Sequence, residues 1–348
     1  LLAKTHLARG WSSAAQGDDF QKAYSISMDL INNRGTYNLG LWSDYGQVNR
    51  KGNEYVQETL LVIDHSADPK YGEYTINQFA AGPKENKSSF YFRPNYPTIG
   101  VNSPNNPAGA SIIDRDLDNG RPFIRIRPNW SYTMQVAFAD KVNDYRFDRT
   151  FQTHWMANKA ATTARGTLVP KVDTAVWMPE RTVTADERNR FKGVIFEPSQ
   201  YTPAFYPSMR KYDDSTRPNI NDASTRPFIL FKFSELYLIA AEAAIKGGAS
   251  VNEAASLINT LRQRAAYNPN RSPAENAAAV VAMTIDPADV NLDLILDERT
   301  REFYGESLRW WDLVRTQSLI RRVQMYNPEA AAGVQAHHVL RPIPQNQI

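Results

Sequence analysis

The sequence contains no cysteine, and this absence excludes disulfide bonds, thiolate catalysis and cysteine-based zinc sites. It also has no run of about 18 apolar residues, so no segment predicts a membrane-spanning helix. Forty Lys and Arg face 37 Asp and Glu, without a basic block of the kind that follows a phosphate backbone. Nucleic acid is therefore not an expected partner.

Motifs of common enzymes and metal sites are also missing. There is no G-x-S-x-G, P-loop or dinucleotide fingerprint, and the five histidines are scattered. His337 and His338 are adjacent but have no third ligand nearby. Residues 114–120 ("DRDLDNG") suggest a calcium loop, but the glycine comes one position late and Arg125 stands where a bidentate glutamate would be. We expect a polar turn there, with no metal site and no cofactor.

The chain begins "LLAKTHLARGW", without a methionine, a signal peptide or a cysteine that could carry a lipid. We expect it to be a mature or trimmed fragment whose targeting information lies outside the sequence.

Helical patterns occur near both ends of the chain. Residues 1–10 predict a short helix that stops at Gly10, and residues 17–35 predict a second, with Asp18 or Asp19 as N-cap and Gly35 beyond its end. The apolar stripe expected on this second helix is Phe20, Tyr24 and Ile31.

A second pair of helices is predicted within residues 226–266. The first is apolar on nearly all sides and ends at Gly247 and Gly248, so it should be central to a core. The next begins with a capping box of Ser250 and Glu253. Its expected stripe consists of Ala254, Ile258, Leu261 and Ala265.

The two pairs share one pattern, in which a helix ends in small residues, a short turn follows, and an acidic cap begins the next helix. This pattern is typical of helical-hairpin repeats, where each pair buries its apolar face by stacking on a neighbour. It matches the tetratricopeptide motif only loosely, and two ordinary helical hairpins remain an alternative.

The helical period disappears between residues 36 and 225. Residues 54–66 and 121–128 look like strands, and long, aromatic-rich loops separate them. We therefore predict a mainly α fold with tetratricopeptide-like helical hairpins. Residues 1–35 and 226–325 form the helical scaffold, residues 36–225 an irregular ligand-binding lobe with short β-strands, and residues 326–348 a tail that packs on the scaffold.

Residues 293–319 ("DLILDERTREFYGESLRWWDLVRTQSL") predict a long amphipathic helix with a candidate bend at Gly305. Glu298 and Glu302 have the i,i+4 spacing that could place a glycosidase-like pair side by side. Arginines three or four positions away should instead keep such carboxylates ionised, whereas a general acid needs a raised pKa. We interpret this segment as a scaffold held by ion pairs along the helix, with one of Trp310 and Trp311 in the core.

Several segments together carry a family resemblance. The segments "FKFSELYLIAAEAAIKGG", "EAASLINTLRQRA", "LILDERTREFYGESLRWWDLVR" and "HHVLRPIPQNQI" resemble, in order and spacing, the C-terminal half of SusD/RagB-family proteins. Gln347 stands where the family commonly has an acidic residue. The family's N-terminal part is absent from this sequence.

The resemblance implies a bundle of tetratricopeptide-like helical pairs with an irregular lobe that carries the ligand site. It also implies a non-enzymatic lipoprotein on the outer face of the outer membrane of Bacteroidetes. Such proteins capture glycans, or in some cases peptides, for import through a TonB-dependent transporter of the SusC type. Membrane attachment would be through an N-terminal lipid that this chain lacks.

A protein that captures sugars needs exposed flat rings next to planar polar groups. The candidate ligand-binding residues on this basis are Tyr91, Arg93, Asn95, Tyr96, Arg127, Asn129, Trp130, Trp155 and Trp177. Alternation in residues 88–97 fits a strand with Phe90 and Phe92 inward and Tyr91 and Arg93 outward. The leading hypothesis is an oligosaccharide-binding protein, and the alternatives are peptide capture within the same family and a glycoside hydrolase that uses Glu298 and Glu302.

Overall fold

The computed structural model describes residues 1–66, 68, 86–99, 109–343 and 345. Part of the aromatic loop noted above, residues 71–85, lies outside this description. Within the described ranges, no helix combines the length and the apolar character that crossing a bilayer requires.

The described residues form α-helices and shorter helical turns along the chain. The α-helices of four or more residues are α1 (Leu2–Gly10), α2 (Asp19–Asn32), α3 (Tyr45–Val48), α4 (Ser88–Tyr91), α5 (Arg146–Thr150), α6 (Ala185–Arg190), α7 (Ser234–Ala243), α8 (Val251–Ala266), α9 (Pro273–Met283), α10 (Leu292–Phe303), α11 (Arg309–Arg315) and α12 (Leu319–Tyr326). Shorter or wider helical turns are η2 (Tyr96–Thr98), η3 (Trp130–Ala137), η4 (Pro198–Gln200), η5 (Ala244–Gly248), η6 (Pro287–Asp289) and η7 (Ala336–Val339).

Within the described residues, the strands are short and make four small sheets. They are β1 (Thr59–Ile63), β2 (Phe151–Gln152), β3 (His154–Met156), β4 (Ala161–Thr163), β5 (Gly166–Leu168), β6 (Thr174–Trp177), β7 (Val194–Ile195), β8 (Ser208–Met209) and β9 (Phe228–Lys232). The sheet orders are β1-β9, β2-β8, β3-β6-β7 and β4-β5, and all pairs are antiparallel except β6 with β7.

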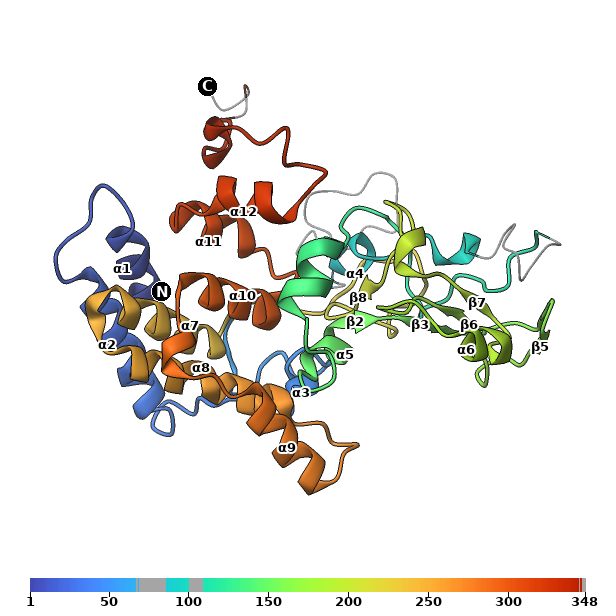
Figure 1. Cartoon of the computed structure of the whole chain (residues 1–348), viewed down its shortest axis with the longest axis horizontal. Helices are drawn as coiled ribbons and strands as arrows, with labels where there is room; N and C mark the ends of the chain where they lie inside the picture. Colours follow the sequence, from blue (N-terminus) through green and yellow to red (C-terminus); the bar gives the residue numbers. More distant parts are fainter. Residues whose placement is uncertain (67, 69–85, 100–108, 344, 346–348) are drawn as a thin grey trace.

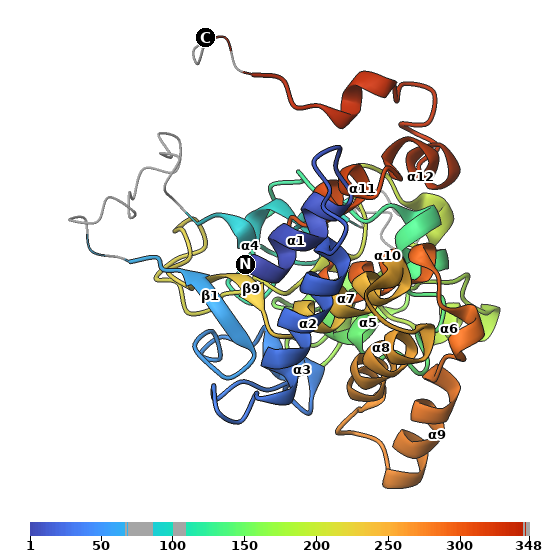
Figure 2. The same cartoon turned by 90° about the vertical axis from the view of Figure 1, so that its left-hand side faces the viewer.

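Helices α1, α2, α7, α8 and α10 gather in one half of the molecule, while α6 lies among the strands of the other half (Figure 1). Helix α1 packs on α2, α2 on α7, and α7 on α8, so the two predicted hairpins stack although about 200 residues of sequence separate them (Figures 1 and 2). This arrangement confirms the mainly α, tetratricopeptide-like fold with short strands. The strands β3 to β7 lie in the other half, beyond α5 and η3 (Figure 1).

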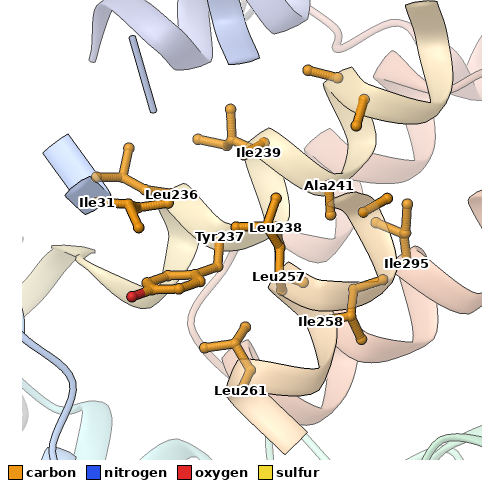
Figure 3. Packing of buried hydrophobic residues seen from close by; sticks show 14 of the residues in the cluster. Ile31, Leu236, Tyr237, Leu238, Ile239, Ala241, Leu257, Ile258, Leu261 and Ile295 are labelled. Carbon is orange, nitrogen blue, oxygen red and sulfur yellow. The ribbon is translucent and has the colours of Figure 1, made fainter. Parts of the chain in front are cut away.

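Helix α7 is the centre of the main core, because every residue from Ser234 to Ala243 is buried. Its apolar side chains meet those of α2, α8 and α10, including Ile31, Ile258 and Ile295 (Figure 3). Burial of each such side chain contributes about 1.5–3 kcal/mol. The stripe predicted for α8 is confirmed, since its four residues are all fully buried.

The start of the predicted apolar helix is wrong. Residues Phe228–Lys232 form strand β9, which pairs with β1 through contacts such as Val62 with Ile229, and α7 begins only at Ser234. A short apolar run suits a strand or a buried helix equally, and a partner strand far away in sequence decides between them. The next helix begins as predicted, with Ser250 and Glu253 capping each other reciprocally.

The buried face of helix α2 is shifted by one position from part of the predicted stripe. Ile31 is buried as predicted, together with Asp19, Ala23 and Ser27, while Phe20 and Tyr24 are half-buried and pack against the same core. Asp19 lies inside the helix and receives hydrogen bonds from Arg9, so it is an interior ion-pair partner rather than a cap.

The predicted strand at residues 121–128 is absent, and this stretch has no regular structure. The predicted strand at 88–97 is also wrong, because Ser88–Tyr91 is a helical turn followed by η2. Phe90 and Phe92 nevertheless point inward, as the alternation had suggested.

The predicted long helix of residues 293–319 is divided into parts. Helix α10 ends at Phe303, and Gly305 and Ser307 then adopt positive φ angles of 77° and 63° before α11 begins. A side chain at position 305 would also meet Met209 at 2.8 Å, so this turn requires glycine for two reasons. The predicted bend at Gly305 is confirmed.

Candidate functional site

The two carboxylates of the hydrolase hypothesis lie at the centre of the protein. Glu298 and Glu302 are both completely buried. Glu298 is within 2.9 Å of guanidinium nitrogens of Arg146, Arg262 and Arg301. Burial by itself would raise the pKa of Glu298, but these three charges outweigh it and hold the pKa well below the ordinary value.

Glu302 has the same kind of surroundings. Burial opposes its ionisation, yet Arg264, Lys232 and Arg146 lower its pKa to about 2. Arg264 and Arg146 both contact its carboxylate directly. An ionised, enclosed carboxylate can neither donate a proton nor reach a substrate, so this arrangement favours a structural role for both acids.

Most of the partners of these carboxylates come from other segments than predicted. The pairs Glu298–Arg301 and Asp312–Arg315 are present as the spacing predicted. The same spacing of three or four residues also predicts pairs of Asp297 with Arg301, of Glu302 with Arg299 and of Glu306 with Arg309. These are not among the ion pairs of the described residues. Asp297 instead pairs with Arg322, Glu302 with Arg146 and Arg264, and Glu306 with Lys211 and Lys232.

The two segments richest in candidate ligand-binding residues lie next to each other. The backbone nitrogens of Arg125 and Ile126 both donate to the carbonyl oxygen of Tyr91 at 3.0 Å, and Ile124 donates to that of Arg93. Tyr91 is 37% exposed and lies edge-on to Phe123. Tyr91 is therefore available to a ligand, beside the start of the second segment.

Arg93 is not available, contrary to its predicted outward orientation. It is 1% exposed and contacts Gln152, Ser208 and Asp213. Asn95, two residues later, is half-buried, and its backbone nitrogen donates to Ala204. Arg93 fixes the interior of the irregular part, because burial of a guanidinium group requires such partners.

Tyr96 and Trp155 are also interior residues. Both are 0% exposed, and their rings stack on each other with centroids 6.3 Å apart. The Tyr96 hydroxyl donates to the carbonyl oxygen of Gly120 at 2.8 Å. These two rings stabilise the core between β3, β6 and η2 and present no face to a ligand.

Trp177 lies on β6, which pairs with strand β3, the strand of the buried Trp155. Its half-buried ring stacks on the exposed His154 at 5.5 Å and leans on Phe191. Burial lowers the pKa of His154. The structure therefore does not bring Trp177 into one site with Tyr91.

Arg127, Asn129 and Trp130 occupy the entrance to η3. Asn129 caps this turn by accepting from the backbone nitrogen of Tyr132, and its amide donates to the carbonyl oxygen of Tyr326 at 2.9 Å. Trp130 is half-buried, edge-on to Tyr201. Arg127 forms a surface ion pair with Glu329.

A cavity of about 480 Å³ lies between these residues and the turn from α10 to α11. This volume is within the range of small-ligand sites, roughly 300–1,000 Å³. Its aromatic lining consists of Phe92, Tyr132, Phe303, Tyr304 and Trp310. Its amide and guanidinium lining consists of Arg127, Asn129, Arg299, Arg309 and Arg341.

Tyr132 forms one wall of this cavity and is held rigidly. Its hydroxyl donates to Asp297 at 2.8 Å and accepts from Arg309 at 2.7 Å, and the Arg309 guanidinium lies 4.8 Å above its ring. Burial, with the nearby Asp297, raises the pKa of Tyr132 to about 12. This wall is therefore neutral and fixed.

Comparison with known proteins decides the family. The model of the SusD family matches residues 117–348, two thirds of the chain. The chain belongs to the SusD family. The SusD-like protein P38 of Formosa agariphila is 34% identical over 104 residues, which are 30% of this chain and 19% of that protein.

Solved structures show the same fold. A SusD homolog from Bacteroides thetaiotaomicron VPI-5482 superposes with a TM-score of 0.61 at 16% identity, over 99% of this chain and 60% of that one. Surface glycan-binding protein A from Bacteroides thetaiotaomicron, solved in complex with laminarihexaose, gives 0.54 at 17%, over 99% and 58%. This SusD-family chain thus spans about three fifths of the length of these relatives.

Of the residues that line the cavity of this SusD-family chain, only Arg127 and Asn129 were among the predicted ligand-binding residues, and Trp310 and Arg341 are among those missed. The Arg341 guanidinium lies 5.1 Å from the Trp310 ring and 5.2 Å from the Trp311 ring. Trp310 is half-buried against the cluster of Leu296, while Trp311 is 58% exposed. The sequence had suggested only that one of Trp310 and Trp311 lies in the core. Arg341, which contacts both rings, comes from the C-terminal tail.

Proposed function

We propose that this chain holds an oligosaccharide in the cavity between η3 and the α10–α11 turn, without changing it chemically. The observation that carries the proposal is the combination of the Trp310 and Tyr132 rings with Arg127, Asn129 and Arg341 around one cavity of about 480 Å³. Sugar C–H faces stack on rings, and their hydroxyls accept from guanidinium and amide groups.

The lowered pKa values of the two buried carboxyl groups of helix α10 support a binding role over a catalytic one. A glycoside hydrolase needs one carboxyl group with a raised pKa facing its substrate. The pKa values of Glu298 and Glu302 are lowered instead, and arginines enclose both side chains.

Family membership supports the biological setting that we propose. In that setting the full-length protein is a lipid-anchored protein at the cell surface of the outer membrane. It passes captured glycan to a SusC-like TonB-dependent transporter. Structural relatives are described as surface glycan-binding and laminarin-binding proteins, at TM-scores of 0.54 and 0.55.

Affinity electrophoresis through gels that contain single glycans tests the proposal. We expect at least one glycan to retard the protein, with a dissociation constant roughly in the micromolar to millimolar range because only one or two rings stack. Incubation with the same glycan should release no reducing ends. Release of reducing ends would contradict the proposal and favour a glycoside hydrolase. Binding of peptides from a protein digest, with no retardation by any glycan, would contradict it and favour peptide capture.

Variants localise the site. Arg127→Ala and Trp310→Leu should each weaken retention several-fold, since they remove a hydrogen-bonding group and a stacking ring from the cavity. Tyr37→Ala is the matched control, because Tyr37 is 51% exposed and follows α2, outside the cavity lining. Unchanged retention in both cavity variants, with wild-type melting temperatures, would place the site elsewhere.

A further inference from the structure

A second cavity, of about 360 Å³, lies on the other side of the end of α10. Its lining comes from α3 and the residues just after it, from α5, and from the residues that follow β8 and precede β9. Tyr45 and Lys211 reach its base, and both donate to the carbonyl oxygen of Glu302 at 3.0 Å. The end of α10 therefore separates this cavity from the candidate glycan site.

The charges that line this cavity are almost all positive. Its only acidic lining residue among those described is Asp213, and its cationic lining residues are Arg50, Lys51, Arg149, Arg210, Lys211 and Arg226. This excess of positive charge is local, because the formal net charge of the whole chain is only +3.

Three of these cations are neutralised by close acids. Lys51 lies 3.0 Å from Asp214, and Arg226 lies 2.7 Å from Glu54. Lys211 contacts Glu306 at 2.7 Å, but Lys232 contacts the same carboxylate oxygen at the same distance. One carboxylate therefore serves two lysines, and positive charge remains.

The other three cations lack a close acid. Arg50 is exposed and forms no ion pair with any described residue. Arg149 lies 3.9 Å from Asp44. Arg210 lies 3.9 Å from Asp213, whose carboxylate already contacts the buried Arg93. Separations near 4 Å at a partly exposed site contribute little attraction, so these guanidinium groups can bind another anion.

The local backbone holds one of these groups in place. The guanidinium of Arg149 lies against Gly46, where an added Cβ would approach its Nε to 2.5 Å. That Nε is buried without a hydrogen-bond partner in the described structure, and the guanidinium also stacks on Tyr145 at 4.4 Å. Arg149 is thus positioned before any ligand arrives, which lowers the entropic cost of binding.

We propose that this cavity binds the oxyanion of a charged sugar residue, a carboxylate or a sulfate ester. Planar guanidinium forks match both groups, and three such groups with surplus charge face one small volume. The inference rests on the proposed glycan-binding function and adds to it that the captured glycan is anionic. This second cavity would then bind the charged group, while the first cavity, between η3 and the α10–α11 turn, binds the faces of the sugar rings.

Isothermal titration calorimetry with glucuronate, glucose 6-sulfate and glucose, at matched ionic strength, tests this proposal. We expect at least one of the two anionic sugars to bind at least ten-fold more tightly than glucose. The advantage should shrink as salt rises from 50 to 500 mM, because screening weakens a partly exposed charge pair. Comparison of the two anions separates the carboxylate source from the sulfate source.

The variant R50Q/R149Q/R210Q removes the three cations that lack a close acid and leaves the buried pairs intact. It should lose the preference for anionic sugars. The control Arg190→Gln removes a more exposed charge from α6, where Arg190 pairs with the surface residue Asp186. This control should keep the preference for anionic sugars.

Three results would each overturn the inference. The first is equal binding of charged and neutral sugars by the wild-type chain, and the second is an unchanged preference in the triple variant. The third is inorganic sulfate that binds as tightly as either sugar, which would make this a site for free anions. Failure of the glycan-binding proposal is distinguishable, because it would abolish retention by neutral glycans and the effects of Arg127→Ala and Trp310→Leu.

Discussion

Arg146 lies 2.7 Å from a carboxylate oxygen of Glu298, and neither side chain is exposed to solvent. Arg146 belongs to α5 in the irregular part of the chain, whereas Glu298 belongs to α10 of the helical part. The same guanidinium also contacts Asp144 and Glu302. This buried ion pair therefore joins the two parts of the protein.

Replacement of Glu298 should destabilise the fold strongly. Glu298→Gln removes the buried negative charge that Arg146, Arg262 and Arg301 share, and removal of one partner from a buried ion pair costs about 3–5 kcal/mol. Urea unfolding followed by circular dichroism measures the change. The control Asp186→Asn breaks an exposed pair with Arg190 and should change the free energy of unfolding by less than about 0.5 kcal/mol. A Glu298→Gln variant of wild-type stability would contradict the structural role.

Stability should fall in acid. Glu302 has a pKa of about 2 in the folded chain, below its ordinary value of 4.5, because Arg264, Lys232 and Arg146 outweigh the effect of burial. The unfolded chain therefore binds more protons, so the stabilisation is complete above about pH 4.5 and disappears as the pH falls toward 2. Its size is on the order of 3 kcal/mol for Glu302. Urea midpoints measured from pH 7 to pH 2 test this, and a flat profile would contradict it.

Trp155 and Tyr91 should separate stability from binding. Trp155→Ala removes a fully buried ring stacked on Tyr96 and should cost about 3–5 kcal/mol. Tyr91→Ala removes a ring that is 37% exposed and lies outside the cavity lining, next in sequence to the lining residue Phe92. It should cost less than about 1 kcal/mol and weaken glycan retention. Thermal melts and affinity gels of both variants check the division. Reversal of the two stability effects would show that the roles of these rings are misassigned.

Gly120 should tolerate no side chain. Its φ of +78° disfavours other residues, and a Cβ there would approach Nε of the buried Arg93 to 2.7 Å. Gly120→Ala should therefore lower the free energy of unfolding by more than about 1 kcal/mol. Gly52→Ala is the matched control, since Gly52 has a φ of +93° with no atom within 4 Å and shows the backbone effect alone. Equal losses in the two variants would mean that the contact with Arg93 contributes nothing.

Local features of the fold could be predicted from the sequence. The reciprocal caps of Ser250 and Glu253, the stripe of α8 and the turn at Gly305 depend on residues within a few positions of each other. Strand β9 could not be predicted in this way, because its pairing partner β1 lies more than 160 residues earlier in the chain. Part of the face that α2 buries was also missed, since an interior ion pair places Asp19 inward.

The candidate site shows the same division. Sequence patterns located two segments of rings and planar polar groups, and the structure places these segments beside each other. They could not show that Arg93, Tyr96 and Trp155 are buried while Tyr91 is exposed. The contribution of Arg341 to the cavity was also hidden, because the tail meets Trp310 only in the folded chain.

From the sequence alone follow the mainly helical fold class of this protein and the ionised state of the acids of α10. The periodicity of apolar residues and the arginines near those acids are enough for that conclusion. The choice of the arginines that neutralise Glu298 and Glu302, and of the rings that reach solvent, follows from the folded arrangement. Partner choice in a low-dielectric interior depends on distances between segments that are remote in sequence, and no local pattern records those distances.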